Sequence, residues 1–240
     1  MNYIIVFISA LLGGFTQTVT GFGSGIVIML FLPYILPIMQ ASALNVMVTV
    51  VLNVILVVKY RKFVNYRMIW IPSLISFAIS TVVIYIGTGL DTNLMKMIFA
   101  LFLIVLAIYF IFFSDKVKLK ADLPTVITCA MLAGAANGLF GIGGPPMALY
   151  FLTITNSKEE YIGTTQVYFL LTSLYTTLIR IMNNVIDEKI VMLILPGLIG
   201  ILIGEFVGIR VVDRISHEKM KRLMYMFLAF SGVVTFIQCL

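Results

Sequence analysis

The length of its uncharged stretches constrains the fold of this chain more than any other feature. The first 58 residues contain no Asp, Glu, Lys or Arg. Six further stretches share this property: residues 68–90, 97–114, 123–157, 161–179, 190–204 and 223–240. Of the whole sequence, 61% is hydrophobic and 11% is charged, whereas a soluble domain carries about 25% charged residues. Because so few charges cannot cover a water-facing surface, we predict an integral membrane protein and disfavour soluble enzymes and nucleic-acid-binding proteins.

The predicted membrane segments are helices. A hydrocarbon core about 30 Å thick requires about 20 helical residues. The uncharged stretches lack the alternation of polar and apolar residues that a membrane β-barrel needs, so the predicted fold class is all-α. Single crossings are predicted at residues 41–59, 68–88, 94–114, 161–182, 190–209 and 221–239.

Two further stretches, residues 3–37 and 123–156, are too long for one helix and short for two full crossings. Glycines near 21–25 interrupt the first, and glycines and prolines near 141–146 interrupt the second. We interpret each as a pair of short or tilted helices that meet at a break. This interpretation gives ten membrane segments, which we prefer, or eight if each pair forms a re-entrant hairpin.

The basic residues predict the orientation. Four loops hold 13 of the 16 Lys and Arg residues: 59–67, 116–120, the loop of Lys158, and 210–222. Cytoplasmic loops of membrane proteins are enriched in Lys and Arg. Placing these loops inside the cell gives a multi-pass protein of the cytoplasmic membrane with both chain ends outside.

The sequence also repeats itself in an inverted arrangement. Glycines at positions 14, 21 and 23 recur 120 residues later at 134, 141 and 143. The basic loop 59–67 corresponds to loop 183–189, which is not basic, so equivalent loops are predicted on opposite sides. We predict two inverted five-segment repeats, 1–114 and 123–240, joined by a cytoplasmic linker at 115–122. Inverted repeats are typical of secondary transporters; the alternative is gene duplication in a membrane protein that does not transport.

Two motifs carry a family resemblance. Residues 138–146, Gly-Leu-Phe-Gly-Ile-Gly-Gly-Pro-Pro, are followed by Leu-Tyr-Phe-Leu at 149–152. This sequence resembles the second-half signature of the sulfite exporter TauE/SafE family. Residues 21–25, Gly-Phe-Gly-Ser-Gly, resemble the first-half signature, with Ser24 where many members have glycine. The resemblance covers essentially the whole chain and implies transport of sulfite, sulfonates or related small anions.

The glycine breaks are the first candidates for the substrate site. A helix that starts inside the membrane exposes backbone N–H groups and the positive end of its dipole, and both attract anions. We expect the helix N-termini near Ser24 and Pro145 to face each other. The predicted substrate-binding residues of the breaks are Gly21, Phe22, Gly23, Ser24, Gly25, Gly141, Gly143 and Gly144. The alternative is that these glycines serve close helix packing.

Buried amides and hydroxyls supply further candidates. Asn45, Thr165 and Gln166 follow the breaks along the chain and are predicted to bind substrate. Gln17 and Asn137 precede the breaks by four residues and are predicted to line the cavity or to cap the broken helices. For Asn53, Ser173, Thr176 and Thr177 we favour hydrogen bonding between helices.

Two charges, Glu205 and Arg180, are candidates for charges inside the membrane, where charges are functional by default. Glu205 is a candidate for proton coupling, or else pairs with Arg210 or reaches the interface. For Arg180 we favour a side chain that reaches the outer surface. No basic residue then stands at the midplane, and anion binding rests on backbone and neutral dipoles. Gly200, Gly204 and Gly208 are predicted to form a close-packing face.

These features predict a secondary active carrier of a small anion, working by alternating access, with a proton as candidate coupling ion. The alternative is an anion channel of the same fold. With two cysteines, one histidine and no nucleotide-binding loop, the sequence predicts no metal, no cofactor and no enzyme activity. Substrate identity and oligomeric state are not predicted.

Overall fold

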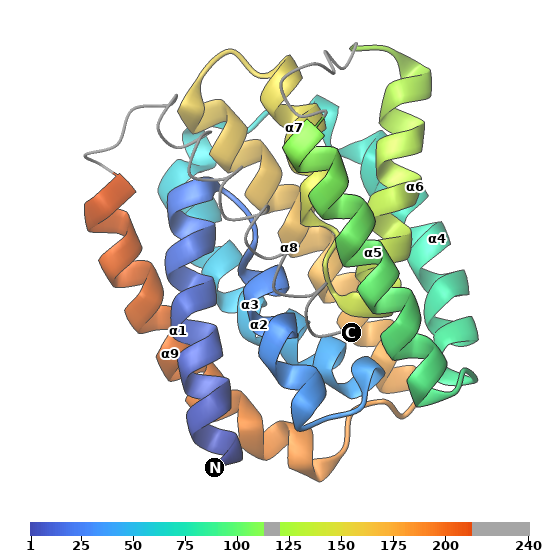
Figure 1. The fold of residues 1–240 in the computed structure, drawn as a ribbon. Coiled ribbons are helices and arrows are strands. Elements are labelled where there is room, and N and C mark those ends of the chain that lie inside the picture. The colour runs from blue at the N-terminus through green and yellow to red at the C-terminus, as the bar shows by residue number, and fades with distance from the viewer. Residues whose placement is uncertain (113–120, 213–240) are drawn as a thin grey trace.

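A computed structural model describes residues 1–112 and 121–212, and the regular secondary structure of these residues is helical (Figure 1). The predicted crossing 221–239, the C-terminus and most of the linker 115–122 lie outside the described residues. The α-helices of the described part are α1 (Asn2–Thr20), α2 (Ser24–Phe31), α3 (Ile38–Tyr60), α4 (Trp70–Thr88), α5 (Thr92–Phe112), α6 (Leu123–Phe140), α7 (Gly144–Ile154), α8 (Lys158–Met182) and α9 (Glu188–Val212).

Five of these helices, α1, α3, α4, α6 and α9, are long and apolar enough to cross a membrane. Their outward faces carry large apolar side chains: Leu74, Val82 and Tyr85 on α4, and Leu195 and Phe206 on α9, are each more than half exposed. Apolar surface on this scale is unfavourable in water and suits contact with lipid. The all-helical, apolar architecture therefore agrees with the predicted membrane protein.

Each glycine-broken stretch consists of one long and one short helix. With 8 and 11 residues, α2 and α7 are only about 12 and 16 Å long, too short to cross a core of about 30 Å. The short helix packs on the long one, α2 on α1 and α7 on α6, and Gly13 of α1 lies against Ile28 of α2. The expected pair of helices meeting at a break is thus found in each stretch, with one long and one short member, and the short length of α2 and α7 favours the hairpin interpretation over two full crossings.

The helices of the two halves pack on each other in matching pairs. Helix α1 packs chiefly on α9, and its counterpart α6 packs chiefly on α4. In the centre, α3 and α8 pack together, α9 lies on α3, and α4 lies on α8. Figure 1 shows α1 and α9 along one side of the bundle and α4 and α6 along the other. If α1, α2, α3 and α4 are replaced by α6, α7, α8 and α9, and the reverse, the same pairs of packed helices result.

Small residues allow the two outer pairs to approach closely. On α9, a Cβ atom at Gly200 would overlap the carbonyl oxygen of Phe7, and one at Gly204 would overlap that of Leu11. The predicted close-packing face is thus confirmed. On α6, a Cβ at Gly134 would lie 2.9 Å from the carbonyl oxygen of Ser76 in α4. Close approach of backbones is the usual role of small residues between membrane helices.

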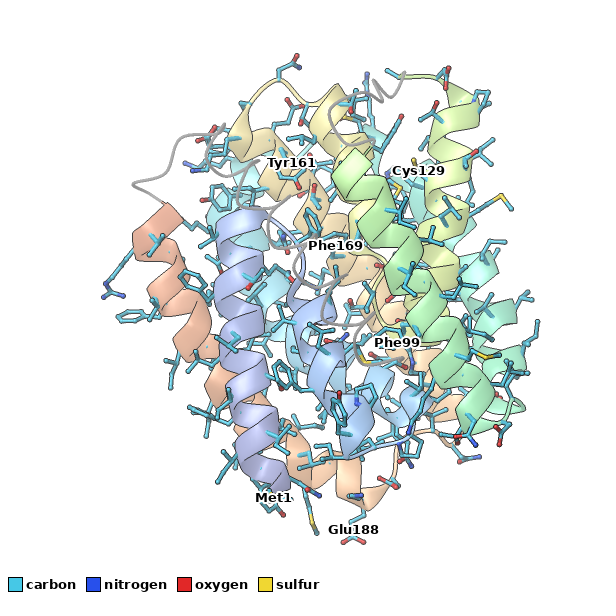
Figure 2. All side chains as sticks on the ribbon, viewed as in Figure 1. Met1, Phe99, Cys129, Tyr161, Phe169 and Glu188 are labelled. Atoms are coloured by element: carbon cyan, nitrogen blue, oxygen red, sulfur yellow. The ribbon has the colours of Figure 1, made fainter. Side chains whose placement is uncertain are left out.

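Loop contacts define the two ends of the bundle. At one end of α3, Asn65 donates its backbone N–H to the Thr164 hydroxyl at 3.0 Å and its side-chain amide to Glu160 at 3.3 Å. At the other end, Gln40 donates to the Asp187 carboxylate at 3.0 Å. Loops 59–67 and 183–189 therefore lie at opposite ends of α3. Figure 2 likewise shows Tyr161 at one end and Met1 with Glu188 at the other.

The α1–α9 packing yields a first prediction. In Gly204→Ala, the added Cβ would overlap the Leu11 carbonyl, and α1 and α9 have to separate. Overpacking of this kind costs about 1–3 kcal/mol, so we expect the Tm of the purified protein to fall by several degrees. Gly89→Ala is the control, because its Cβ would lie at an ordinary 3.6 Å from the Ile86 oxygen. Equal Tm values for the two variants would contradict the close packing.

Candidate functional site

The two long helices of the hairpins end at glycines in the left-handed conformation. Gly21 ends α1 with φ = 86°, and Gly141 ends α6 with φ = 67°. Side chains with a Cβ rarely adopt this conformation, and glycine adopts it freely. Each glycine N–H bonds the preceding turn, Gly21 to the Gln17 carbonyl at 2.7 Å and Gly141 to the Asn137 carbonyl at 2.9 Å. The two breaks, residues 21–23 and 141–143, are therefore equivalent helix ends.

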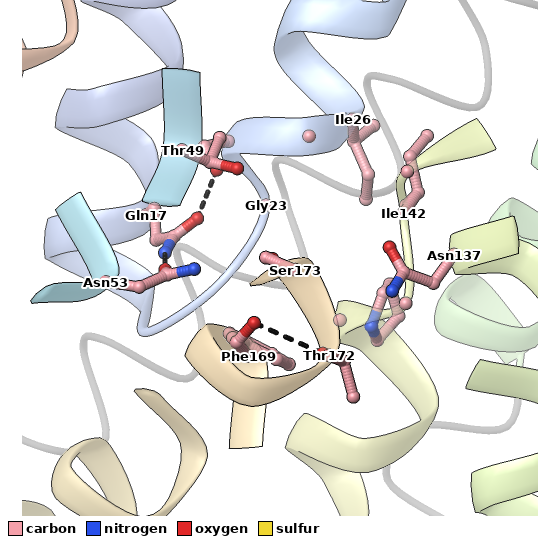
Figure 3. A pocket seen from close by; sticks show the side chains of 16 residues that line it. Gln17, Gly23, Ile26, Thr49, Asn53, Asn137, Ile142, Phe169, Thr172 and Ser173 are labelled. Atoms are coloured by element: carbon pink, nitrogen blue, oxygen red, sulfur yellow. Dashed lines mark hydrogen bonds between the residues drawn. The ribbon is translucent and has the colours of Figure 1, made fainter. Parts of the chain in front are cut away.

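Both breaks border one cavity of about 40 Å³ (Figure 3). The first turn of α2 touches the second break there: a Cβ at Gly25 would lie 3.0 Å from the Gly141 carbonyl oxygen. On this measure one water takes about 10–15 Å³, so the cavity has room for only a few atoms in this conformation. Its walls come from both halves of the chain: Gln17, Gly23, Ser24, Gly25, Ile26, Thr49, Asn53, Asn137, Gly141, Ile142, Gly143, Gly144, Pro145, Phe169, Thr172 and Ser173.

The two short helices begin at this cavity and differ in what they offer. The first turn of a helix leaves its N–H groups without partners in the helix; in α2 the intrahelical bonds start with Val27, which donates to the Gly23 carbonyl at 3.2 Å. Pro145 and Pro146 in the first turn of α7 have no N–H. Helix α2 therefore supplies more donors than α7, while both direct a positive dipole end toward the cavity.

Two buried amides brace the breaks across the two halves. The side-chain amide of Asn45 in α3 donates to the Gly141 carbonyl at 3.1 Å, and that of Gln166 in α8 donates to the Gly21 carbonyl at 2.9 Å. Both side chains are completely buried. Thus each central helix holds the break of the opposite half.

Gln17 joins four helices at the cavity wall. Its amide donates to Asn53 in α3 at 2.8 Å and to Gln166 in α8 at 3.2 Å. The Ser24 hydroxyl of α2 in turn donates to the Gln17 side-chain oxygen. Figure 3 shows Gln17 beside Asn53 and Thr49. The hydroxyl of Ser24, a predicted substrate-binding residue, is therefore engaged by Gln17 in this conformation.

The predicted site residues divide between the wall and the layer behind it. Gly23, Ser24, Gly25, Gly141, Gly143 and Gly144 line the cavity, as do Gln17 and Asn137. Five others do not line it: Gly21, Phe22, Asn45, Thr165 and Gln166. Thr165 is completely buried, and its hydroxyl has no hydrogen-bond partner within the described part of the chain. Substrate binding by any of these residues stays a prediction.

Sequence reasoning missed part of the wall. Asn53 and Ser173, expected only to bond between helices, line the cavity together with Thr49 and Thr172. The signal for Thr49 and Asn53 was their spacing of four and eight residues after Asn45, which puts them on one helix face. Thr176, expected to bond between helices, instead donates to the Thr172 carbonyl of its own helix at 2.9 Å.

Of the two intramembrane charges, Arg180 differs from expectation. Arg180 does not reach the surface: it is completely buried and donates to the carbonyls of Asn137 at 2.7 Å and Gly138 at 3.0 Å. These carbonyls lie at the C-terminal end of α6, which attracts a cation. Glu205 is 2% exposed and lies outside the cavity wall. The alternative pairing of Glu205 with Arg210 is not found among residues 121–212; Arg210 stacks 3.4 Å from the centre of the Phe206 ring.

Comparison with known proteins gives one match. The family model described as "Sulfite exporter TauE/SafE" matches residues 6–235. No curated protein and no solved structure matches the chain. The matched range includes both breaks and every residue of the cavity wall. In the described part of the chain, no group of three His, Cys, Asp or Glu residues is arranged to hold a metal ion.

The bracing amides yield a second prediction. Gln166→Leu keeps a similar volume but leaves the buried Gly21 carbonyl without its donor. A buried polar group without a partner costs about 1–3 kcal/mol, so the variant should unfold at lower temperature than the wild type. In the control Gln40→Leu, the lost bond to Asp187 is exposed, and we expect little change. Thermal unfolding of the purified proteins measures both, and an unchanged Tm for Gln166→Leu would refute the bracing role.

Proposed function

The chain belongs to the sulfite exporter TauE/SafE family, and from this membership we propose that it is a secondary transporter. Family membership and the apolar helices make it a multi-pass membrane transport protein. Its proposed cargo is a small sulfur-containing or organic anion of the sulfite or sulfonate class, which it moves across the cytoplasmic membrane by alternating access.

The observation that carries this proposal is the meeting of two helix breaks at one cavity. Helix α2 starts at the cavity with the N–H groups of its first turn, and the dipoles of α2 and α7 both point their positive ends there. Oxyanions bind at such helix N-termini because backbone N–H groups and the dipole act together. Thr49, Asn53, Asn137, Thr172 and Ser173 add neutral polar groups to the wall.

We further propose that the chain consists of two inverted repeats, 1–114 and 123–240, joined by the linker 115–122. Three observations support this division: both halves contain a long–short hairpin, the packing pairs exchange between halves, and loops 59–67 and 183–189 lie at opposite ends of α3. In transporters of this architecture the substrate site lies between the repeats.

The packing suggests which parts move. Helices α1, α2 and α9 form one group, and α6, α7 and α4 form the other. The cavity lies where the two groups meet around the central α3–α8 pair. Rocking of one group against the other would expose the cavity to the two sides in turn. Basic residues favour the cytoplasmic side of a membrane, so loop 59–67 is proposed to face the cytoplasm. Met1 and loop 183–189 are then outside.

Transport assays test the function. In proteoliposomes we expect sulfite uptake to saturate and to be accelerated by sulfite inside the vesicles. Gly25→Val should lower uptake at least tenfold, because its side chain would press on Gly141 and on Asn45, each 3.0 Å from the added Cβ. Gly89→Val is the matched control. Full uptake by Gly25→Val would refute the site, and flux without saturation or counterflow would favour the alternative, an anion channel of the same fold.

A proton is the proposed coupling ion, with Glu205 as its carrier. Glu205 is buried in α9, one of its carboxylate oxygens has no hydrogen-bond partner in the described part of the chain, and Lys59 of α3 is its charged neighbour. Glu205→Gln cannot exchange a proton, so sulfite uptake should lose its dependence on pH. Glu188→Gln, at the exposed start of the same helix, should retain it. A Glu205→Gln variant with wild-type pH dependence would exclude this role.

A further inference from the structure

We propose that Arg180 supplies the positive charge that balances the anion in the cavity. This inference rests on the proposed function, because it assumes that the cavity binds an anion. It also revises the expectation that binding relies on backbone and neutral dipoles alone. Arg180 acts across the cavity wall, as a charge that positions and stabilises the anion, and not as a wall residue.

Within the part of the chain that the structure describes, Arg180 is a cation without a balancing charge. Among the Lys and Arg residues of the described part, it alone is buried, with no exposed surface at all. Its Nε and Nη1 atoms have no hydrogen-bond partner there, and no carboxylate pairs with it among residues 1–112 and 121–212. A buried charge is costly unless it is paired. The two free donors and the unbalanced charge of Arg180 therefore suit a transient anionic partner.

The position of Arg180 relates it to the cavity. Helix α8 lines the cavity with Thr172 and Ser173, continues through the buried Thr176, and reaches Arg180 one turn later. Helical side chains point back toward the N-terminus of their own helix, so the guanidinium leans from Arg180 toward Thr176 and the cavity. Its Nη2 bonds the backbone carbonyl of Asn137, a residue that lines the cavity. The guanidinium is therefore bonded to the backbone of a wall residue, although Arg180 does not line the cavity itself.

The hydrogen bonds of the guanidinium fix its position but do not neutralise its charge. Both acceptors, the carbonyls of Asn137 and Gly138, are neutral groups at the C-terminal end of α6. The end of the helix dipole offsets only about half an elementary charge. A small anion with two or more oxygens, such as sulfite or a sulfonate, would complete the balance when it enters the cavity.

A purely structural role for Arg180, as a cap of α6, makes a different prediction. Loss of a cap lowers the Tm of the empty protein but leaves its response to an anion unchanged. Loss of the balancing charge reduces that response itself, because a ligand raises Tm only in proportion to its binding to the folded state. Sulfite-dependent stabilisation therefore separates the two roles even if both lower the basal Tm.

The test measures the Tm of the purified full chain against sodium sulfite, with sodium chloride at matched ionic strength as the reference. We expect sulfite to raise the Tm of the wild type and of Arg210→Gln, which removes an exposed charge. Arg180→Gln should need at least tenfold more sulfite for the same shift, and Arg180→Lys, which keeps the charge, should stay within a few-fold of the wild type. A wild-type response in Arg180→Gln would overturn the inference.

A second pair of variants covers the case in which Arg180→Gln does not fold. Thr176→Asp places a carboxylate one turn before Arg180, where it can pair with the guanidinium, whereas Thr176→Asn has the same shape without charge. The inference predicts that only the Asp variant loses the sulfite response; equal responses would overturn it. If the wild type itself shows no sulfite response, the proposed function and this inference fail together. If the wild type responds and the variants respond equally, only the inference about Arg180 fails.

Discussion

The structure depends on one requirement of the hydrocarbon phase: each backbone N–H and C=O group needs a partner within the protein. Helices meet this requirement along their length, but α1 and α6 end where their hairpins turn, at Gly21 and Gly141. The carbonyls freed there are taken up by side chains, Gln166 for Gly21 and Asn45 for Gly141. Without these two amides, both breaks would carry unpaired polar groups in an apolar interior.

The two bracing amides come from opposite halves of the chain, and this couples the breaks to the assembly of the whole bundle. Asn45 belongs to α3 and reaches the second break, whereas Gln166 belongs to α8 and reaches the first. Neither break can therefore be satisfied within its own half, so the two halves have to come together before either hairpin is fully bonded. The first turn of α2 also contacts the second break, where Gly25 lies against the Gly141 carbonyl. Any relative motion of the two halves has to act on these bonds, which ties access to the cavity to the packing of the central helices.

Much of this arrangement could be predicted from the sequence, and the rest could not, for physical reasons. Uncharged stretches and glycine clusters indicate helices and breaks because hydrophobicity and conformational freedom are local properties; Gly200 and Gly204 were correctly assigned to close packing on the same grounds. The unequal lengths of the hairpin helices escaped prediction, since α2 and α7 lie in apolar sequence as long helices do. The bracing role of Asn45 and the burial of Arg180 depend on carbonyls contributed by α6. A sequence shows that a polar side chain lies on a helix, but not which backbone group it meets.

The arrangement of charge suits a carrier better than a tight binder. The cavity wall presents neutral groups such as Asn53 and Ser173, and the nearest buried cation stands behind it on the α6 carbonyls. A cation in the wall would hold a small divalent anion strongly in a dry site, and release would become slow. In the role proposed for Arg180, a charge behind the wall would lower the energy of a bound anion less, because Coulomb attraction falls with distance. Moderate binding of this kind permits both entry and release, which transport requires.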